Sequence, residues 1–185
     1  YVSGDGTVTN NLAIVYLSSN GDDRNTGNST GRAVKTLGRA VAIAKASTNT
    51  SVKIVVLNTI TIADTEAVYA DLPIEWSTSN TSDTVMFELN SGANMSLGEA
   101  DIDGNGIVAV FHVNDGAQLK LQDQMTVSDC TQAVDLEANG TFKLSRATLS
   151  GAVNLNTSGS TTSYVILQHA LTAGNPLAIT CPSSY

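Results

Sequence analysis

The sequence contains few charged side chains, and basic ones are the scarcest. Charged residues make up 14% of the 185, and nine Lys and Arg stand against 17 Asp and Glu, which gives a net charge of −8. This balance disfavours nucleic acid and anionic membrane surfaces as partners, since both attract basic patches. No apolar stretch reaches the 18 or more residues of a membrane-spanning helix. We therefore expect neither nucleic-acid binding nor membrane insertion.

Cysteines and targeting signals are also scarce. Cys130 and Cys181 are the two cysteines, and they fall at different positions of the repeat described below. Their placement favours two separate buried thiols over a disulfide, although both remain open. The chain begins at Tyr1 without Met or a signal peptide, so we expect a mature or excised piece of something longer.

An internal repeat is the strongest positive feature of the sequence. Similar segments begin at Phe87, Phe111 and Val134, at intervals of about 23 residues, and a degenerate fourth copy opens at Val153. Each copy holds two short strands with alternating apolar residues, a turn between them, and a third apolar cluster. Three short strands per turn of about 23 residues predict a parallel β-solenoid, whose coils stack at the strand spacing of about 4.8 Å.

We expect an all-β fold, a right-handed parallel β-helix of about six coils of roughly 23 residues with one N-terminal capping helix. Apolar residues recur at helical spacing over residues 34–46, and a helix there would cover the open end of the solenoid. Residues 1–50 would form the cap from an edge strand, an Asn- and Gly-rich loop and this helix. Residues 51–185 would form the coils, and the edge at Leu177 and Ile179 would continue into further coils or be covered by a partner.

Alignment of the repeats places equivalent residues in columns along the solenoid. Inward columns are apolar, and one of them contains Phe87, Phe111, Val134 and Val153. Outward columns are polar, and they contain Glu88, His112, Asp135 and Asn154, and Asn90, Asn114, Glu137 and Asn156. Trp76 has the parity of inward residues, which favours core packing over a platform for sugar stacking.

The N-terminal segment resembles the opening of many secreted right-handed parallel β-helix proteins of the pectin-lyase-like superfamily. The likeness lies in the strand at 15–17, the Asn-, Asp- and Gly-rich loop at 18–27, and Thr-Leu-Gly-Arg-Ala at 36–40. Together with Leu-Gly-Glu-Ala-Asp-Ile-Asp-Gly-Asn-Gly at 97–106, the chain looks most like the β-helical regions of large bacterial surface adhesins. The resemblance implies an extracellular protein at the cell surface, but its motifs specify fold and secretion rather than activity.

One segment suggests a calcium site. Asp101, Asp103 and Asn105 fit the first half of an EF-hand-type loop, in which alternating oxygens wrap the ion. His112 stands at position twelve, where a bidentate Glu is required. The other interpretation is a simple turn, and no other cofactor is expected.

A second group of residues suggests ligand binding. His112 lies between Glu88 and Asp135 in an outward column, and Lys120 and Lys143 share one repeat position. A histidine beside carboxylates suits pH-sensitive binding. The alternative is a ladder of solvent-facing side chains without a ligand.

The sequence favours a binding function over catalysis. Polysaccharide lyases and glycosidases of this fold use clustered acidic residues with a basic or histidine partner. The coils contain no adjacent Asp-Asp pair and no Gly-His-Gly, and few long loops could wall a cleft. We expect a non-catalytic adhesin module that binds carbohydrate or a host surface glycoprotein. The alternatives are a structural subunit that self-associates into a filament or matrix through its solenoid ends, and a polysaccharide lyase or hydrolase.

Overall fold

The computed structural model describes residues 12–49, 51–68, 74–79, 83–122, 125–156, 163–168 and 179–180. The strands are β1 (Leu12–Leu17), β2 (Ser51–Val56), β3 (Ile60–Ile62), β4 (Thr65–Val68), β5 (Ile74–Thr78), β6 (Val85–Leu89), β7 (Asn94–Gly98), β8 (Ala100–Val113), β9 (Gln118–Gln122), β10 (Thr126–Glu137), β11 (Thr141–Ser145), β12 (Thr148–Leu149), β13 (Ala152–Asn156), β14 (Tyr164–Gln168) and β15 (Ile179–Thr180). The helical segments are a 3₁₀ turn at Thr30–Arg32 and helix α1 at Leu37–Ala46.

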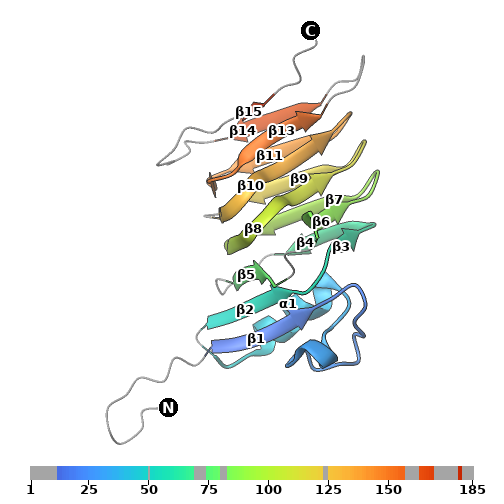
Figure 1. Cartoon of the computed structure of the whole chain (residues 1–185), viewed down its shortest axis with the longest axis vertical. Coiled ribbons are helices and arrows are strands. Elements are labelled where there is room, and N and C mark those ends of the chain that lie inside the picture. The colour runs from blue at the N-terminus through green and yellow to red at the C-terminus, as the bar shows by residue number, and fades with distance from the viewer. Residues whose placement is uncertain are drawn as a thin grey trace, which may run out of the picture.

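The strands form two sheets of parallel strands, and in both sheets the strands follow one another along the long axis of the molecule, as Figure 1 shows. A ten-stranded sheet contains β1, β2, β3, β5, β6, β8, β10, β12, β13 and β15, and a five-stranded sheet contains β4, β7, β9, β11 and β14. Strands inside each sheet pair with their equivalents in neighbouring coils, as in β7 with β9 and β9 with β11. The predicted parallel β-solenoid is therefore confirmed.

The solenoid has about four turns, so the predicted six coils were wrong. Strands of the five-stranded sheet begin at positions 65, 94, 118, 141 and 164, so four steps lead from the first strand of this sheet to the last. A turn closes only where both sheets contribute a strand. Opposite β1 lies a helix instead of a strand, and for β15 the described residues contain no strand in the other sheet.

Helix α1 begins at Leu37, not at the predicted Val34, because the backbone of Val34 pairs with β1. Val34 pairs with Leu17 in an isolated parallel bridge and so covers the outer edge of β1. The helix then starts at a capping residue, Thr36, whose Oγ1 accepts the N–H of Arg39 at 3.3 Å. The loop after β1 and the helix together cover this end of the solenoid, as the predicted cap requires.

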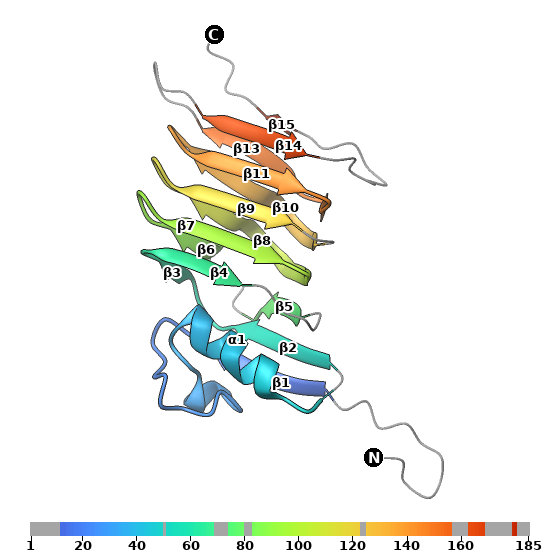
Figure 2. The ribbon, with the colours of Figure 1, turned by 180° about the vertical axis from the view of Figure 1, so that it is seen from behind.

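Figure 2 shows α1 lying over β1 and β2, below β4 of the five-stranded sheet. Its buried side chains are Leu37, Ala40, Val41 and Ala44, which recur at intervals of three and four along the helix. The helix thus continues the layer of the five-stranded sheet and shields the first coil from water. Neither helical segment among the described residues has the length and apolarity of a membrane span.

A carboxylate in the loop after β1 fixes the start of α1. Asp23 Oδ1 accepts the N–H groups of Lys35 at 2.8 Å and Thr36 at 2.9 Å, and Oδ2 accepts the Thr36 hydroxyl at 2.8 Å. Partial burial raises the pKa of the Asp23 carboxyl. The hydrogen bonds from Thr36 and Lys35, together with the positive charge of Arg39, lower the pKa by more than burial raises it. The net effect holds the pKa of Asp23 below its ordinary value of 3.8.

The coils turn between the two sheets at β-turns that require a left-handed residue. In three successive coils the third residue of the turn has positive φ, namely Gly92 at 78°, Gly116 at 72° and Asn139 at 55°. The turns are closed by hydrogen bonds of 2.9 to 3.1 Å from Ala93 N to Asn90 O, Ala117 N to Asn114 O and Gly140 N to Glu137 O. Gly and Asn are the residues that tolerate this conformation best.

Two of the three predicted strand segments per repeat join into one long strand. Strand β8 has 14 residues and β10 has 12, and each links the last apolar cluster of one repeat to the first strand of the next. Left-handed residues bend them, at Asn105 and Gly106 in β8 and at Asp129 in β10. The coil therefore has two sheets, of which the ten-stranded one is bent.

The predicted inward columns are confirmed by the strand register. Phe87 pairs with Phe111, Phe111 with Val134, and Val134 with Val153, and all four are fully buried. Trp76 is 1% exposed and meets Phe87 edge-on at a centroid distance of 5.8 Å, which confirms its place in the core. Burial of these columns from water is the main stabilising force along the solenoid.

Candidate functional site

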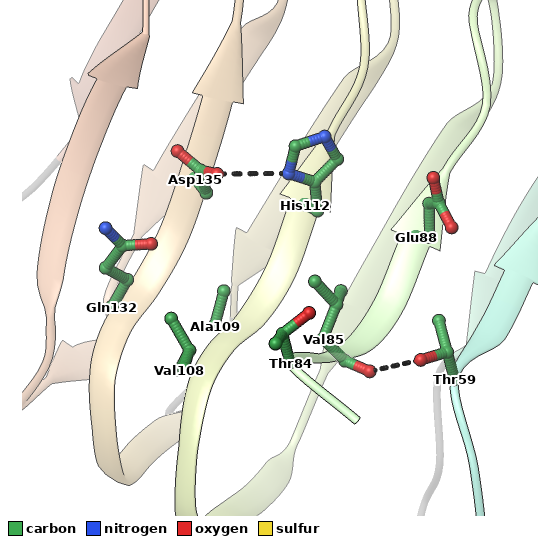
Figure 3. Close-up of a pocket in the computed structure, with 9 residues that line it drawn as sticks. All are labelled: Thr59, Thr84, Val85, Glu88, Val108, Ala109, His112, Gln132 and Asp135. Carbon is green, nitrogen blue, oxygen red and sulfur yellow. Dashed lines mark hydrogen bonds and ion pairs between the residues drawn. The ribbon is translucent and has the colours of Figure 1, made fainter. Parts of the chain in front are cut away.

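A polar groove lies on the outer surface of the ten-stranded sheet. It has a volume of about 420 Å³ and crosses strands from three successive coils, β6, β8 and β10, as Figure 3 shows. Its lining consists of Thr59, Thr84, Val85, Glu88, Val108, Ala109, His112, Gln132 and Asp135. We refer to this hollow as the ladder groove.

Strand alternation places the charged side chains of the groove. Glu88 pairs in register with His112, and His112 with Asp135. Each follows a buried residue of the inward column, such as Phe111 before His112, so each points outward. The structure thus brings together three of the five predicted ligand-binding residues.

Hydrogen bonds connect this outward column across four coils. His112 Nδ1 lies 3.1 Å from Asp135 Oδ2, and His112 Nε2 lies 3.1 Å from Asn114 Oδ1. Asn114 Nδ2 donates to Glu88 Oε1 at 3.4 Å, and Asn154 Nδ2 donates to Asp135 Oδ1 at 2.8 Å. The side chains are therefore held in a continuous network rather than projecting independently into solvent.

Glu137 joins the same network from the next outward position of β10. Its Oε1 lies 3.9 Å from His112 Nε2. His112, Asp135 and Glu137 have side-chain exposures of 21%, 19% and 30%, so all three are partly shielded but open to solvent. Among the described residues they are the one group of three His, Cys, Asp or Glu side chains whose ligand atoms converge as at a metal site.

The rest of the groove wall was not predicted from the sequence. Thr59 is fixed by its hydroxyl, which donates to Val85 O at 2.7 Å, and by its N–H, which donates to Asp83 Oδ2 at 2.7 Å. Val108 is 48% exposed, and Gln132 lies on the neighbouring strand β10, in register with Ala109. Val108 has the same parity as His112, so strand alternation places it outward, and an apolar residue at an outward position was the one available signal.

Lys120 and Lys143 lie elsewhere. They pair in register on β9 and β11 of the five-stranded sheet, so the structure does not bring them to the ladder groove. Any binding role for these lysines remains a prediction and would concern a separate surface.

The predicted calcium ligands lie at the bend of β8, outside the ladder groove. Asp103 Oδ1 accepts the N–H of Asn105 at 2.9 Å, and Asn105 Nδ2 donates to Thr78 O at 3.1 Å. Asp101 pairs in register with Glu75, a carboxylate that the sequence analysis did not connect with it. The hydrogen bonds account for the turn, while calcium binding here remains a prediction.

Four further residues singled out in the sequence are Leu177, Ile179 and the two cysteines. Ile179 belongs to β15 and pairs with Val153, whereas Leu177 lies outside the described residues. Cys130 is a half-buried free cysteine, and Cys181 also lies outside the described part. Burial, with a smaller effect of the Asp129 charge, raises the pKa of the Cys130 thiol to about 11, so it is a poor nucleophile at neutral pH.

No family model, curated protein or solved structure matches this chain. The parallel β-solenoid consequently rests on the sequence repeat and the strand pairing described above. These comparisons lend no support to membership of the pectin-lyase-like superfamily or to kinship with surface adhesins.

Proposed function

We propose that this chain is a non-catalytic, extracellular module of a cell-surface adhesin, built as a right-handed parallel β-helix, and that the ladder groove binds carbohydrate on a host glycoprotein. The observation that carries the proposal is the groove itself. Hydrogen-bonding side chains from successive coils converge there on a rigid sheet beside an exposed apolar residue, Val108. Binding sites for small polar ligands combine these features.

The groove chemistry favours neutral or amino sugars. Carboxylates of Glu88 and Asp135 can accept hydrogen bonds from sugar hydroxyls, and Thr84 and Gln132 can both donate and accept. Val108 offers an apolar contact for the C–H face of a sugar ring. No Lys or Arg is among the residues that line the groove, so uronic and sialic acids would meet uncompensated negative charge.

The test is binding of the full chain to an array of neutral, amino and acidic glycans, followed by titration calorimetry with the best glycan. Gln132→Ala and Thr84→Ala should each weaken binding by about five- to tenfold, since each removes a hydrogen bond. Lys120→Ala and Lys143→Ala are the matched controls on the other sheet and should bind as the wild type does. Absence of any bound glycan, or loss of binding only in the lysine variants, would overturn the proposal.

Incubation of the chain with polysaccharides tests the enzymatic alternative. A polysaccharide lyase or hydrolase would release new reducing ends or unsaturated uronates from polymeric substrates such as pectin with Ca²⁺. A non-catalytic module leaves those polymers intact under conditions in which it binds the glycan. Product release that disappears in Asp135→Asn would make the chain an enzyme.

Self-association is the second candidate function, and one observation favours it. Strand β14 pairs with β11 on one edge, and within the described residues no strand pairs with its other edge. Such an edge can accept a strand from another molecule. Sedimentation velocity over a concentration series tests this role, because end-to-end assembly gives species that grow with concentration and a monomer at high micromolar concentration excludes it.

A further inference from the structure

We propose that His112, Asp135 and Glu137 bind one divalent transition-metal ion, for which Zn²⁺ is the appropriate probe. The proposal goes beyond carbohydrate binding and does not depend on it. It rests on the convergence of the three side chains, on the hydrogen-bonding requirements of the imidazole, and on the charge around it.

The three ligands come from two adjacent strands with a fixed register. His112 on β8 pairs with Asp135 on β10, and Glu137 follows two positions later on the same side of β10. One ligand atom from each lies within 4.8 Å of the other two. Around a tetrahedral Zn²⁺ the ligand atoms stand about 3.4 Å apart, so rotations that move them by about 1 Å would close the site.

Both ring nitrogens of His112 face oxygen atoms that accept hydrogen bonds. The Glu88 carboxylate only accepts hydrogen bonds, so Asn114 directs its amide nitrogen to Glu88 and its oxygen to His112 Nε2. Asp135 Oδ2 faces the other ring nitrogen at 3.1 Å and also accepts. A neutral ring has one N–H and satisfies one of these two oxygens. A metal ion bound at one ring nitrogen would remove this mismatch, because the other nitrogen then donates its N–H to the remaining oxygen.

The charge around the ring favours a cation. Carboxylates of Asp135 and Glu137 on β10 approach the two ring nitrogens, Glu88 lies in register with His112 on β6, and the described lining of the ladder groove contains no Lys or Arg. Closely spaced carboxylates repel one another, and a bound divalent ion reduces that repulsion. The partial exposure of the three ligands leaves them accessible to an ion from solvent.

The donor atoms also indicate which ions bind. An imidazole nitrogen with two carboxylate oxygens suits Zn²⁺ and neighbouring transition metals, whereas Ca²⁺ and Mg²⁺ prefer oxygen ligands alone. Zn²⁺ should therefore bind here in the presence of excess Ca²⁺. This preference separates the site from the calcium site predicted at Asp101, Asp103 and Asn105.

The experiment is calorimetric titration of ZnCl₂ into the full chain, with CaCl₂ in a parallel titration. We expect one equivalent of Zn²⁺, an affinity that falls as the pH is lowered because protons compete for the imidazole, and no competition from Ca²⁺. His112→Gln and Glu137→Gln should each weaken Zn²⁺ binding by at least about tenfold. His169→Gln is the matched control, because it removes the chain's other histidine and should leave binding unchanged.

Two results would overturn the proposal. One is the absence of saturable Zn²⁺ binding by the wild-type chain, and the other is binding that survives His112→Gln but disappears in His169→Gln. Circular dichroism checks that each variant folds, and Asp135→Asn replaces any variant that does not. A measurement on the wild type alone is also decisive, because Zn²⁺ must shift the ring-nitrogen resonances of His112 in an imidazole ¹⁵N spectrum. Gln132 and Thr84, which test carbohydrate binding, are not metal ligands, so failure of one proposal does not imply failure of the other.

Discussion

The stack of Phe87 on Phe111 predicts an energetic coupling between neighbouring coils. Their ring centroids lie 5.5 Å apart with planes 19° from parallel, and both side chains are fully buried. Phe87→Leu and Phe111→Leu should each lower the free energy of unfolding by about 1 to 2 kcal/mol, because each shrinks a filled core position. A stacked aromatic pair contributes about 0.5 to 1.5 kcal/mol beyond the area it buries. The double variant should therefore be less destabilised than the sum of the single variants by about 1 kcal/mol.

Urea unfolding of the single and double variants measures the coupling energy between Phe87 and Phe111. Trp76 is the chain's single tryptophan and touches Phe87, so its fluorescence reports on the stack, while circular dichroism reports on the strands as a whole. Phe142 is equally buried but pairs in register with Leu119 on the other sheet, so Phe87→Leu combined with Phe142→Leu should be additive. A coupling below about 0.3 kcal/mol for Phe87 with Phe111, or an equal one for Phe87 with Phe142, would refute the reasoning.

Two further predictions concern a turn and the cap. Gly116→Ala should destabilise the chain by about 1 kcal/mol because the φ of Gly116 is 72°, a left-handed conformation that Ala disfavours, while the added Cβ would clash with nothing. Gly116→Asn should cost less, since Asn139 adopts the same conformation at the equivalent turn position. Urea unfolding of both variants measures the difference. Because the folded pKa of Asp23 lies below 3.8, its stabilising effect is complete above that pH and is lost as the pH falls through the lowered value. Asp23→Asn should flatten this acid dependence in thermal melts recorded from pH 2 to 5, and an unchanged profile would contradict the assignment.

The solenoid could be predicted from the sequence because equivalent positions of the repeat pair in register in neighbouring coils. Phe87, Phe111 and Val134 recur at intervals of about 23 residues, and a coil of that length places each one over the last. The number of turns could not be predicted in the same way. It depends on which segments of the two sheets lie opposite each other, and α1 takes the place of a strand opposite β1.

The candidate site was predictable only within one column. Glu88, His112 and Asp135 share a repeat position and a sheet, so alignment placed them together. Lys120 and Lys143 share another repeat position, but periodicity does not tell which outward columns lie on the same sheet. The groove wall depends on the bends of β8 and β10, where the register shifts between Ser128 and Cys130, and that irregularity has no periodic signal.

The coils follow one another at a uniform step, so the solenoid can change in length by whole coils. Each strand of the five-stranded sheet from β7 to β14 offers the next one a similar parallel edge after about 23 residues. Duplicating one such segment would lengthen the rod by about 4.8 Å and leave the orientation of every flanking side chain intact. Inserting a single residue into a strand would instead turn the inward residues after it outward. The length of the solenoid could therefore change in fixed increments without altering the ladder groove.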